Sequence, residues 1–176
     1  MKHRSPKQYR LLAVALSSRG LGYAVLEGQK FLVDYGNTSV KGDKNRQCLA
    51  KVEKLTALYR PDALVLQDVT AKGSHRAHRI QSLSRQIMKA ARKRRLIVRL
   101  FTEKQLRNLL LGDAHGTKQE MAEMVAKQFP DELASRLPPK RRTWESIDAR
   151  MDIFDAVGLA VAFRKKEVKG ATPISE

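Results

Sequence analysis

Two acidic residues in the C-terminal part of the chain have a spacing that could support metal chemistry. Asp152 and Asp155 lie in a segment with the apolar pattern of a helix, at positions i and i+3, so we expect both on one helical face. Carboxylate oxygens are the ligands that Mg²⁺ prefers in proteins. A purely structural interpretation also exists, because acids early in a helix stabilise its dipole and either could pair with Arg150. The spacing alone leaves both interpretations open.

A second set of residues is cationic and could bind phosphate groups. The chain has 35 Lys and Arg against 18 Asp and Glu, a formal net charge of +17. Such an excess usually persists because a polyanion neutralises it, which predicts nucleic acid as the partner. Any single basic cluster could equally be a solvated surface. The candidate nucleic-acid-binding residues are Lys72, His75, Arg76, Arg79, Arg85, Lys89, Arg92, Lys93, Lys140, Arg141 and Arg142.

The composition also limits the other functions that we expect. Aromatic residues make up 6% of the chain, which disfavours a stacking platform for single strands and favours backbone contacts with duplex or branched nucleic acid. No apolar run approaches the roughly 20 residues that span a bilayer, so no membrane partner is expected. The one cysteine, Cys48, excludes an internal disulfide. We therefore predict a cytoplasmic or nucleoid-associated protein.

The hydrophobic pattern predicts the elements that must position these residues. Three short apolar segments separated by tight turns predict an antiparallel meander, and alternating helices and strands follow it. The predicted strands are 11–16, 22–26, 31–35, 63–66 and 96–100. The predicted helices are 48–58, a helix carrying Ile80 to Ala91, 103–111, 118–129 and 147–163, with 130–146 irregular. This order predicts an α/β fold with a mixed five-stranded sheet flanked by helices.

Four segments, in this order and spacing, resemble segments of the RuvC-type Holliday junction resolvases, over about residues 11–163. They are 11–28 (LLAVALSSRGLGYAVLEG), 61–67 (PDALVLQ), 102–125 and 152–160 (DIFDAVGLA). The resemblance implies an RNase H-like domain over 11–163, between a basic arm (1–10) and a flexible charged tail (164–176). It also implies phosphodiester hydrolysis, with four carboxylates holding two Mg²⁺ ions, and a homodimer. The apolar face of the helix around Ile80 to Ala91 is a candidate dimer interface.

Only half of the acid positions carry over from this family. Asp152 and Asp155 match the acids of its last helix, whereas Ala15 and Gln67 stand where the resemblance places an Asp and a Glu. Two close divalent ions need several negative charges, so a set with about half of the expected charge disfavours catalysis. We therefore predict a binding protein that needs no cofactor, with DNA favoured over RNA.

Two other functions remain open at this point. The first is an active structure-selective endonuclease, in which Mg²⁺ or Mn²⁺ is held by Asp152, Asp155 and another carboxylate. The second is a basic subunit of a larger nucleoprotein assembly. Neither is separated from the binding hypothesis by the sequence.

Overall fold

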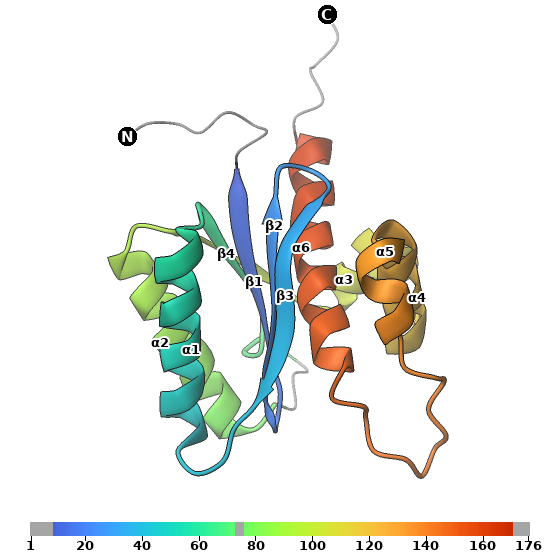
Figure 1. Ribbon diagram of the computed structural model, residues 1–176, viewed down its shortest axis with the longest axis horizontal. Helices are drawn as coiled ribbons and strands as arrows, with labels where there is room; N and C mark the ends of the chain where they lie inside the picture. Colours follow the sequence, from blue (N-terminus) through green and yellow to red (C-terminus); the bar gives the residue numbers. More distant parts are fainter. Residues whose placement is uncertain (1–8, 73–75, 171–176) are drawn as a thin grey trace, which may run out of the picture.

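A five-stranded sheet lies between two layers of helices in the computed structural model, which describes residues 9–72 and 76–170 (Figure 1). The strand order is β3-β2-β1-β4-β5, with β1, β2 and β3 antiparallel and β1, β4 and β5 parallel. The strands are β1 (Arg10–Leu16), β2 (Gly20–Glu27), β3 (Phe31–Ser39), β4 (Ala63–Gln67) and β5 (Ile97–Phe101). This topology confirms the predicted mixed sheet.

The helices cover both faces of this sheet. The helices are α1 (Lys44–Tyr59), α2 (His78–Lys93), α3 (Glu103–Leu111), α4 (Lys118–Gln128), α5 (Pro130–Leu133), a 3-10 turn η1 (Ala134–Arg136) and α6 (Met151–Gly170). Helices α1 and α2 lie on one face, and α6 lies on the other with α3, α4 and α5 outside it (Figure 1). Because both faces are covered, the central strands read as continuous apolar runs.

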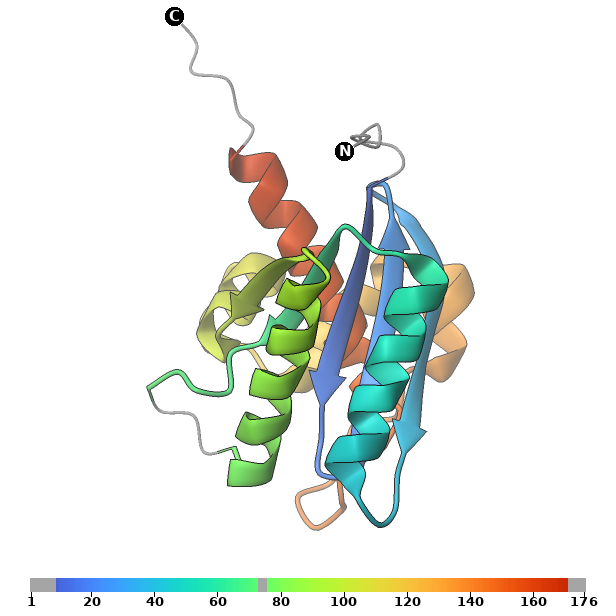
Figure 2. The same ribbon diagram turned by 90° about the vertical axis from the view of Figure 1, so that its left-hand side faces the viewer.

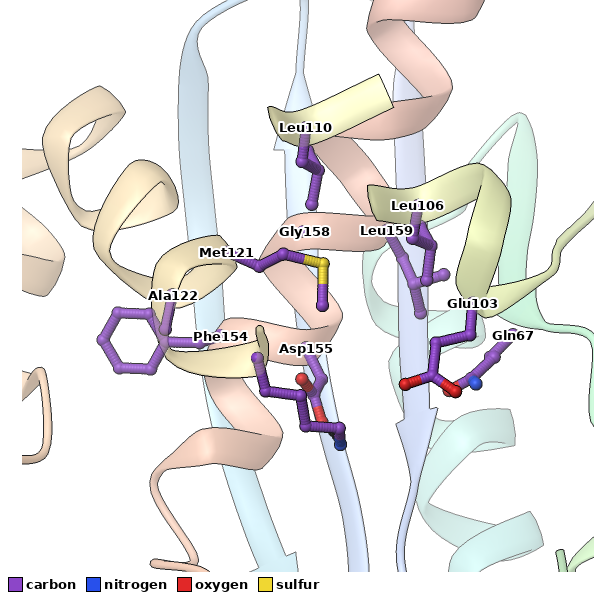
Figure 3. Close-up of a pocket in the computed structure, with 11 residues that line it drawn as sticks. Gln67, Glu103, Leu106, Leu110, Met121, Ala122, Phe154, Asp155, Gly158 and Leu159 are labelled. Atoms are coloured by element: carbon purple, nitrogen blue, oxygen red, sulfur yellow. Dashed lines mark hydrogen bonds and ion pairs between the residues drawn. The ribbon is translucent and has the colours of Figure 1, made fainter. Parts of the chain in front are cut away.

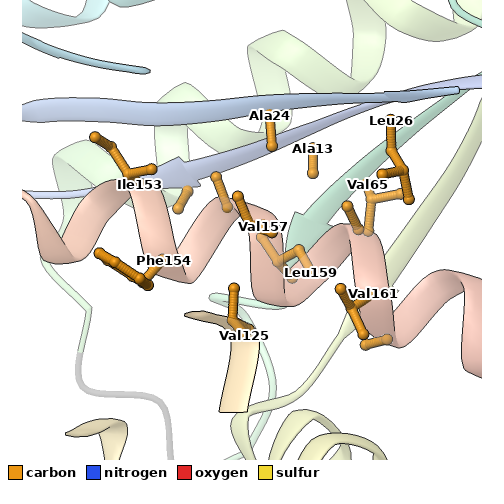
Figure 4. Close-up of a cluster of buried hydrophobic side chains, with 14 of the residues drawn as sticks. Ala13, Ala24, Leu26, Val65, Val125, Ile153, Phe154, Val157, Leu159 and Val161 are labelled. Carbon is orange, nitrogen blue, oxygen red and sulfur yellow. The ribbon is translucent and has the colours of Figure 1, made fainter. Parts of the chain in front are cut away.

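The alternation of side chains along β1 assigns each residue to one of two hydrophobic cores. Leu12, Val14 and Leu16 pack with α1 and α2, whereas Ala13 and Ala15 belong to the core under α6. Figure 4 shows this second core, in which small strand side chains such as Ala13 and Ala24 face α6. The small residues let the helix approach the sheet closely.

Helix α6 begins directly against β2. A Cβ atom on Gly22 would lie 1.9 Å from the backbone oxygen of Asp152, so only glycine fits at this position. Gly22 pairs with Ala15 in the β1–β2 register. Because paired residues on adjacent strands share a face, Ala15 also faces the first turn of α6. The sheet thus places Asp152 beside Ala15.

The structure differs from the predicted elements between β5 and the C-terminus. The segment 130–146, predicted to be irregular, contains α5 and η1, whose apolar Leu133 is fully buried. Such short helices hold too few residues to show a helical period. Helix α6 begins at Met151 rather than at residue 147, and it continues to Gly170 rather than ending at Phe163.

The apolar face of α2 is used within the chain. Ile80, Leu83 and Ile87 are buried against β1, β4 and α1. This face cannot also form the dimer interface that we considered, because its side chains already pack in the core. A homodimer through another surface stays a prediction. Among residues 9–72 and 76–170, no helix has the length and apolar character needed to cross a membrane.

Candidate functional site

The candidate site lies at the carboxyl ends of β1 and β4, where the start of α6 meets the sheet. Gln67 is the last residue of β4 and Ala15 the last but one of β1, and both lie on the face toward α6. Gln67 lines a cavity of about 30 Å³ together with Glu103 and Asp155, whose polar ends gather at one side of it (Figure 3). The topology therefore brings the four positions at which the resemblance implies acids to one edge of the sheet, although two of them carry no carboxylate here.

Asp152 is a buried carboxylate. Its side chain accepts a hydrogen bond of 2.8 Å from the Ser17 hydroxyl, and the residue is only 7% exposed. Burial raises the pKa of Asp152, and the negative charge of Asp155 raises it further, against the Ser17 hydrogen bond and the nearby cation Arg19. Its environment thus disfavours the ionised form that would bind a metal.

Asp155 is paired with a cation of the chain itself. The Lys118 ammonium lies 3.1 Å from Asp155 Oδ2. Lys118 is the first residue of α4, which Thr117 and Glu120 fix through a reciprocal capping box. The ammonium of Lys118 therefore lies beside the carboxylate oxygen to which a divalent ion would bind.

Gln67 also contacts a cation. Arg76 donates to Gln67 Oε1 at 3.2 Å and to the backbone oxygen of Leu16 at 3.3 Å, so its guanidinium joins the ends of β4 and β1. A neutral amide can accept this bond but cannot neutralise the charge. The guanidinium of Arg76 therefore stays available to attract an anion.

Two more cations contact the turn that follows β1. Arg79 donates to the backbone oxygen of Ser17 at 3.3 Å, and Lys44 donates to that of Ser18 at 2.8 Å. We call Lys44, Arg76 and Arg79 the turn cluster. No ion pair found within residues 9–72 and 76–170 includes any of the three. Three cations held by neutral carbonyls create a positive potential at this edge of the sheet.

These donors do not fit the pair of Mg²⁺ ions that the resemblance implies. Ala15 has no ligand atom, the oxygen of Gln67 accepts from Arg76, and Asp155 is bound by Lys118. Within the described parts of the chain, no three His, Cys, Asp or Glu side chains come close enough together to hold a metal ion. Several carboxylates would have to converge to tolerate two divalent cations.

Glu103 is a residue of this site that the sequence reasoning missed. It follows β5, whose carboxyl end lies next to that of β4, and it lines the small cavity with Gln67 and Asp155 (Figure 3). Its carboxylate is 2.6 Å from Arg107, one helical turn along α3. An acid directly after a parallel strand was the available signal, because such strands end at one edge of the sheet.

The predicted basic residues fall into separate surfaces. Arg76 and Arg79 belong to the turn cluster, and Lys140 and Arg141 line a pocket beside Lys118. Helix α2 lies on the opposite face of the sheet from α6 (Figure 2) and carries four of the predicted basic residues, all exposed; they are Arg85, Lys89, Arg92 and Lys93. Arg142 and Lys72 are exposed in loops, and His75 lies outside the described residues.

Solved structures of Holliday junction resolvases have a similar fold. The Thermus thermophilus RuvC structure has a TM-score of 0.69 and 17% identity, covering 92% of this chain and 96% of that one. T. thermophilus RuvC in complex with a Holliday junction substrate has a TM-score of 0.68 and 16% identity, covering 93% and 97%. The yeast mitochondrial Holliday junction resolvase Ydc2 has a TM-score of 0.59 and 10% identity, covering 94% and 84%.

No protein-family model matches the sequence, and no curated protein matches it either. The class that the comparisons define is therefore one of fold: the chain has a RuvC-like α/β fold over nearly its whole length. One of the similar structures is a complex with a Holliday junction substrate.

Proposed function

We propose that this protein binds branched DNA through the phosphate backbone, at the carboxyl edge of its sheet, and does not cut it. The observation that carries the proposal is that cations of the chain itself contact the residues that the resemblance assigns to metal binding. Lys118 binds Asp155, and Arg76 binds Gln67. A centre of this kind attracts phosphate directly, without a divalent ion between protein and DNA.

The charge distribution supports the same conclusion. The turn cluster places three cations around the ends of β1 and β4, and its members make no ion pair among the described residues. Contacts of this type position a protein on DNA without reading its sequence. A fold shared with a junction-bound structure supplies the reason to expect branched rather than linear DNA.

Binding should be measured against salt concentration, in EDTA, with a labelled four-way junction and with linear duplex. We expect tighter binding to the junction, and a linear fall of log K with log salt. Replacing Lys44, Arg76 and Arg79 by alanine should weaken binding and reduce the salt slope by about 0.9 for each phosphate that the variant no longer neutralises. An unchanged slope would contradict the proposed location of the DNA.

The matched control removes the same charge from another surface. Lys89, Arg92 and Lys93 are exposed in the C-terminal half of α2, whereas Arg79 of the turn cluster lies in the first turn of that helix. Their triple alanine variant should bind the junction with nearly the wild-type slope. If both triple variants lose affinity equally, net charge rather than the turn cluster governs binding.

One observation favours the active endonuclease as a second candidate. Glu103 and Asp155 both line the small cavity beside Gln67, so two carboxylates face the same space. Each is paired with a cation, Arg107 or Lys118, which would have to move away before a metal could bind. Cleavage of a junction in Mn²⁺ separates this function from binding alone.

A further inference from the structure

The loop between η1 and α6 carries an exposed tryptophan at its tip. Trp144 is the only tryptophan in the chain, and it is 77% exposed. The guanidinium of Arg142 lies 5.6 Å from the ring centroid. The indole ring is large and amphipathic, so an exposed tryptophan can supply a stacking surface for a planar ligand.

The tip of this loop is held by its own hydrogen bonds. The backbone N–H of Arg142 donates to the Glu145 carboxylate at 2.9 Å, and the N–H of Glu145 donates back to the Arg142 oxygen at 3.1 Å. Asn37 on β3 anchors the far end of the loop, by donating to the Ala149 oxygen at 2.8 Å. Trp144 is therefore presented by an ordered turn, which lowers the entropic cost of contacting a ligand.

A pocket of about 380 Å³ lies against the two arms of the same loop. Its apolar lining consists of Pro138, Pro139, Ile147 and Met151. Its charged lining consists of three cations, Lys118, Lys140 and Arg141, and one carboxylate, Asp148, which is paired with Arg150 at 2.6 Å. An apolar surface beside three cations suits a ligand that is planar and apolar at one end and anionic at the other, as a nucleotide is.

Lys118 connects this pocket to the candidate site. Lys118 lines both this pocket and the small cavity of the candidate site, so the two are adjacent on the protein. Fully paired DNA keeps its bases stacked inside the duplex. A base can meet an indole ring only where the strand is unpaired, as at a branch or a bulge.

We propose that this loop receives one unpaired nucleotide of a branched or bulged DNA. Lys140 and Arg141 bind its phosphate at the pocket, and Trp144 stacks on its base. The proposal rests on the proposed function. It adds what the turn cluster cannot supply, a preference for DNA with an unpaired base over fully paired DNA of the same length.

Trp144 provides the assay, because its fluorescence reports on this loop alone. The probes are a duplex with one unpaired thymine and a fully paired duplex of matched length. We expect the bulged duplex to quench and shift the tryptophan emission, and the paired duplex to leave it nearly unchanged. Trp144→Ala should weaken binding of the bulged duplex by about 5- to 150-fold, the range for removal of one stacked base, and binding of the paired duplex by less than about twofold.

Two further variants test the two parts of the site. Trp144→Phe keeps an aromatic face and should retain most of the preference for the bulge. Ile147→Glu places a carboxylate on the exposed pocket lining and should lower that preference, while binding of the paired duplex stays close to wild type.

The outcomes separate this proposal from the proposed function. Loss of all DNA binding by the wild-type protein would overturn both. Equal affinity for the two duplexes, with unchanged tryptophan emission, would overturn the nucleotide site alone. A preference for the bulge that survives Trp144→Ala would overturn the role of the indole, and would leave Trp144 as a contact for a protein partner.

Discussion

Ala15→Asp restores one of the carboxylates that the resemblance to resolvases implies, and its cost can be worked from the structure. Ala15 is 7% exposed, and it pairs with Gly22, which touches Asp152. The new carboxyl group would therefore lie beside an acid whose pKa burial already raises. Of the two cations that act on Asp152, Lys118 is bound to Asp155, which leaves Arg19 alone to balance two acids.

The electrostatic cost at pH 7 has an upper limit, because the new acid can always fold in its protonated form. Each pH unit above the ordinary Asp pKa costs about 1.4 kcal/mol, so about three units give a limit near 4 kcal/mol. An uncompensated buried charge costs about 3–5 kcal/mol, which agrees with this limit. We therefore expect the charge of Ala15→Asp to lower the free energy of unfolding by about 3–4 kcal/mol at pH 7, in addition to the cost of its bulk.

Ala15→Asn is the matched control, because it adds the same bulk without the charge. Overpacking alone costs about 1–3 kcal/mol and does not depend on pH. The folded-state pKa of the new Asp is raised, so its penalty grows as the pH rises from the unfolded value toward the folded one. Urea unfolding of both variants at pH 4 and pH 7 should give a difference between Asp and Asn at pH 7 that largely disappears at pH 4.

The same experiment with added Mg²⁺ tests whether the site still holds a metal. We expect 10 mM Mg²⁺, about the highest concentration that is useful in such titrations, to leave both variants unchanged. If Mg²⁺ restored Ala15→Asp to the stability of Ala15→Asn, the remaining acids would still form a metal site. That result would refute the conclusion that cations of the chain have taken the place of the metal.

The contacts of the site support three other predictions. Asp152→Asn should stabilise the protein at neutral pH. It should also flatten the decline in stability that the raised pKa of Asp152 produces as the pH rises above 3.8. Urea unfolding across pH would check this, and an unchanged pH profile would count against it. Gly22→Ala should cost about 1–3 kcal/mol of unfolding free energy, since its Cβ would lie 1.9 Å from the Asp152 oxygen, and thermal melts showing wild-type stability would be inconsistent with this packing. Lys118→Ala should change stability by less than about 1 kcal/mol, because the pair with Asp155 is partly exposed, yet it should weaken junction binding in a titration; equal affinity would remove Lys118 from the DNA surface.

The sheet could be predicted because local patterns determine its strands, and a local pattern also indicated the candidate acids. The apolar run Leu11 to Leu16 indicated a strand covered on both faces, and Asp152 and Asp155 indicated an acidic helical face. These features depend on residues close together in the chain. The order of these elements then predicted a mixed five-stranded sheet, and the sheet topology confirmed it.

The partners of the site residues could not be predicted in the same way. Lys118 meets Asp155 across 37 positions of sequence, and Arg76 reaches the ends of two different strands. Such contacts depend on how helices pack on the sheet, which no local pattern encodes. The role of Glu103 was missed for the same reason, since only the neighbouring ends of β4 and β5 bring it near Gln67.

The central claim is that this RuvC-like fold binds branched DNA without cutting it. The most direct measurement incubates a labelled four-way junction with the wild-type protein and with the Asp152→Asn/Asp155→Asn double variant, in EDTA and in Mn²⁺. We predict a shifted, intact junction for both proteins under both conditions. Nicked product that requires Mn²⁺ and is absent with the double variant would contradict the claim, and would identify an active nuclease.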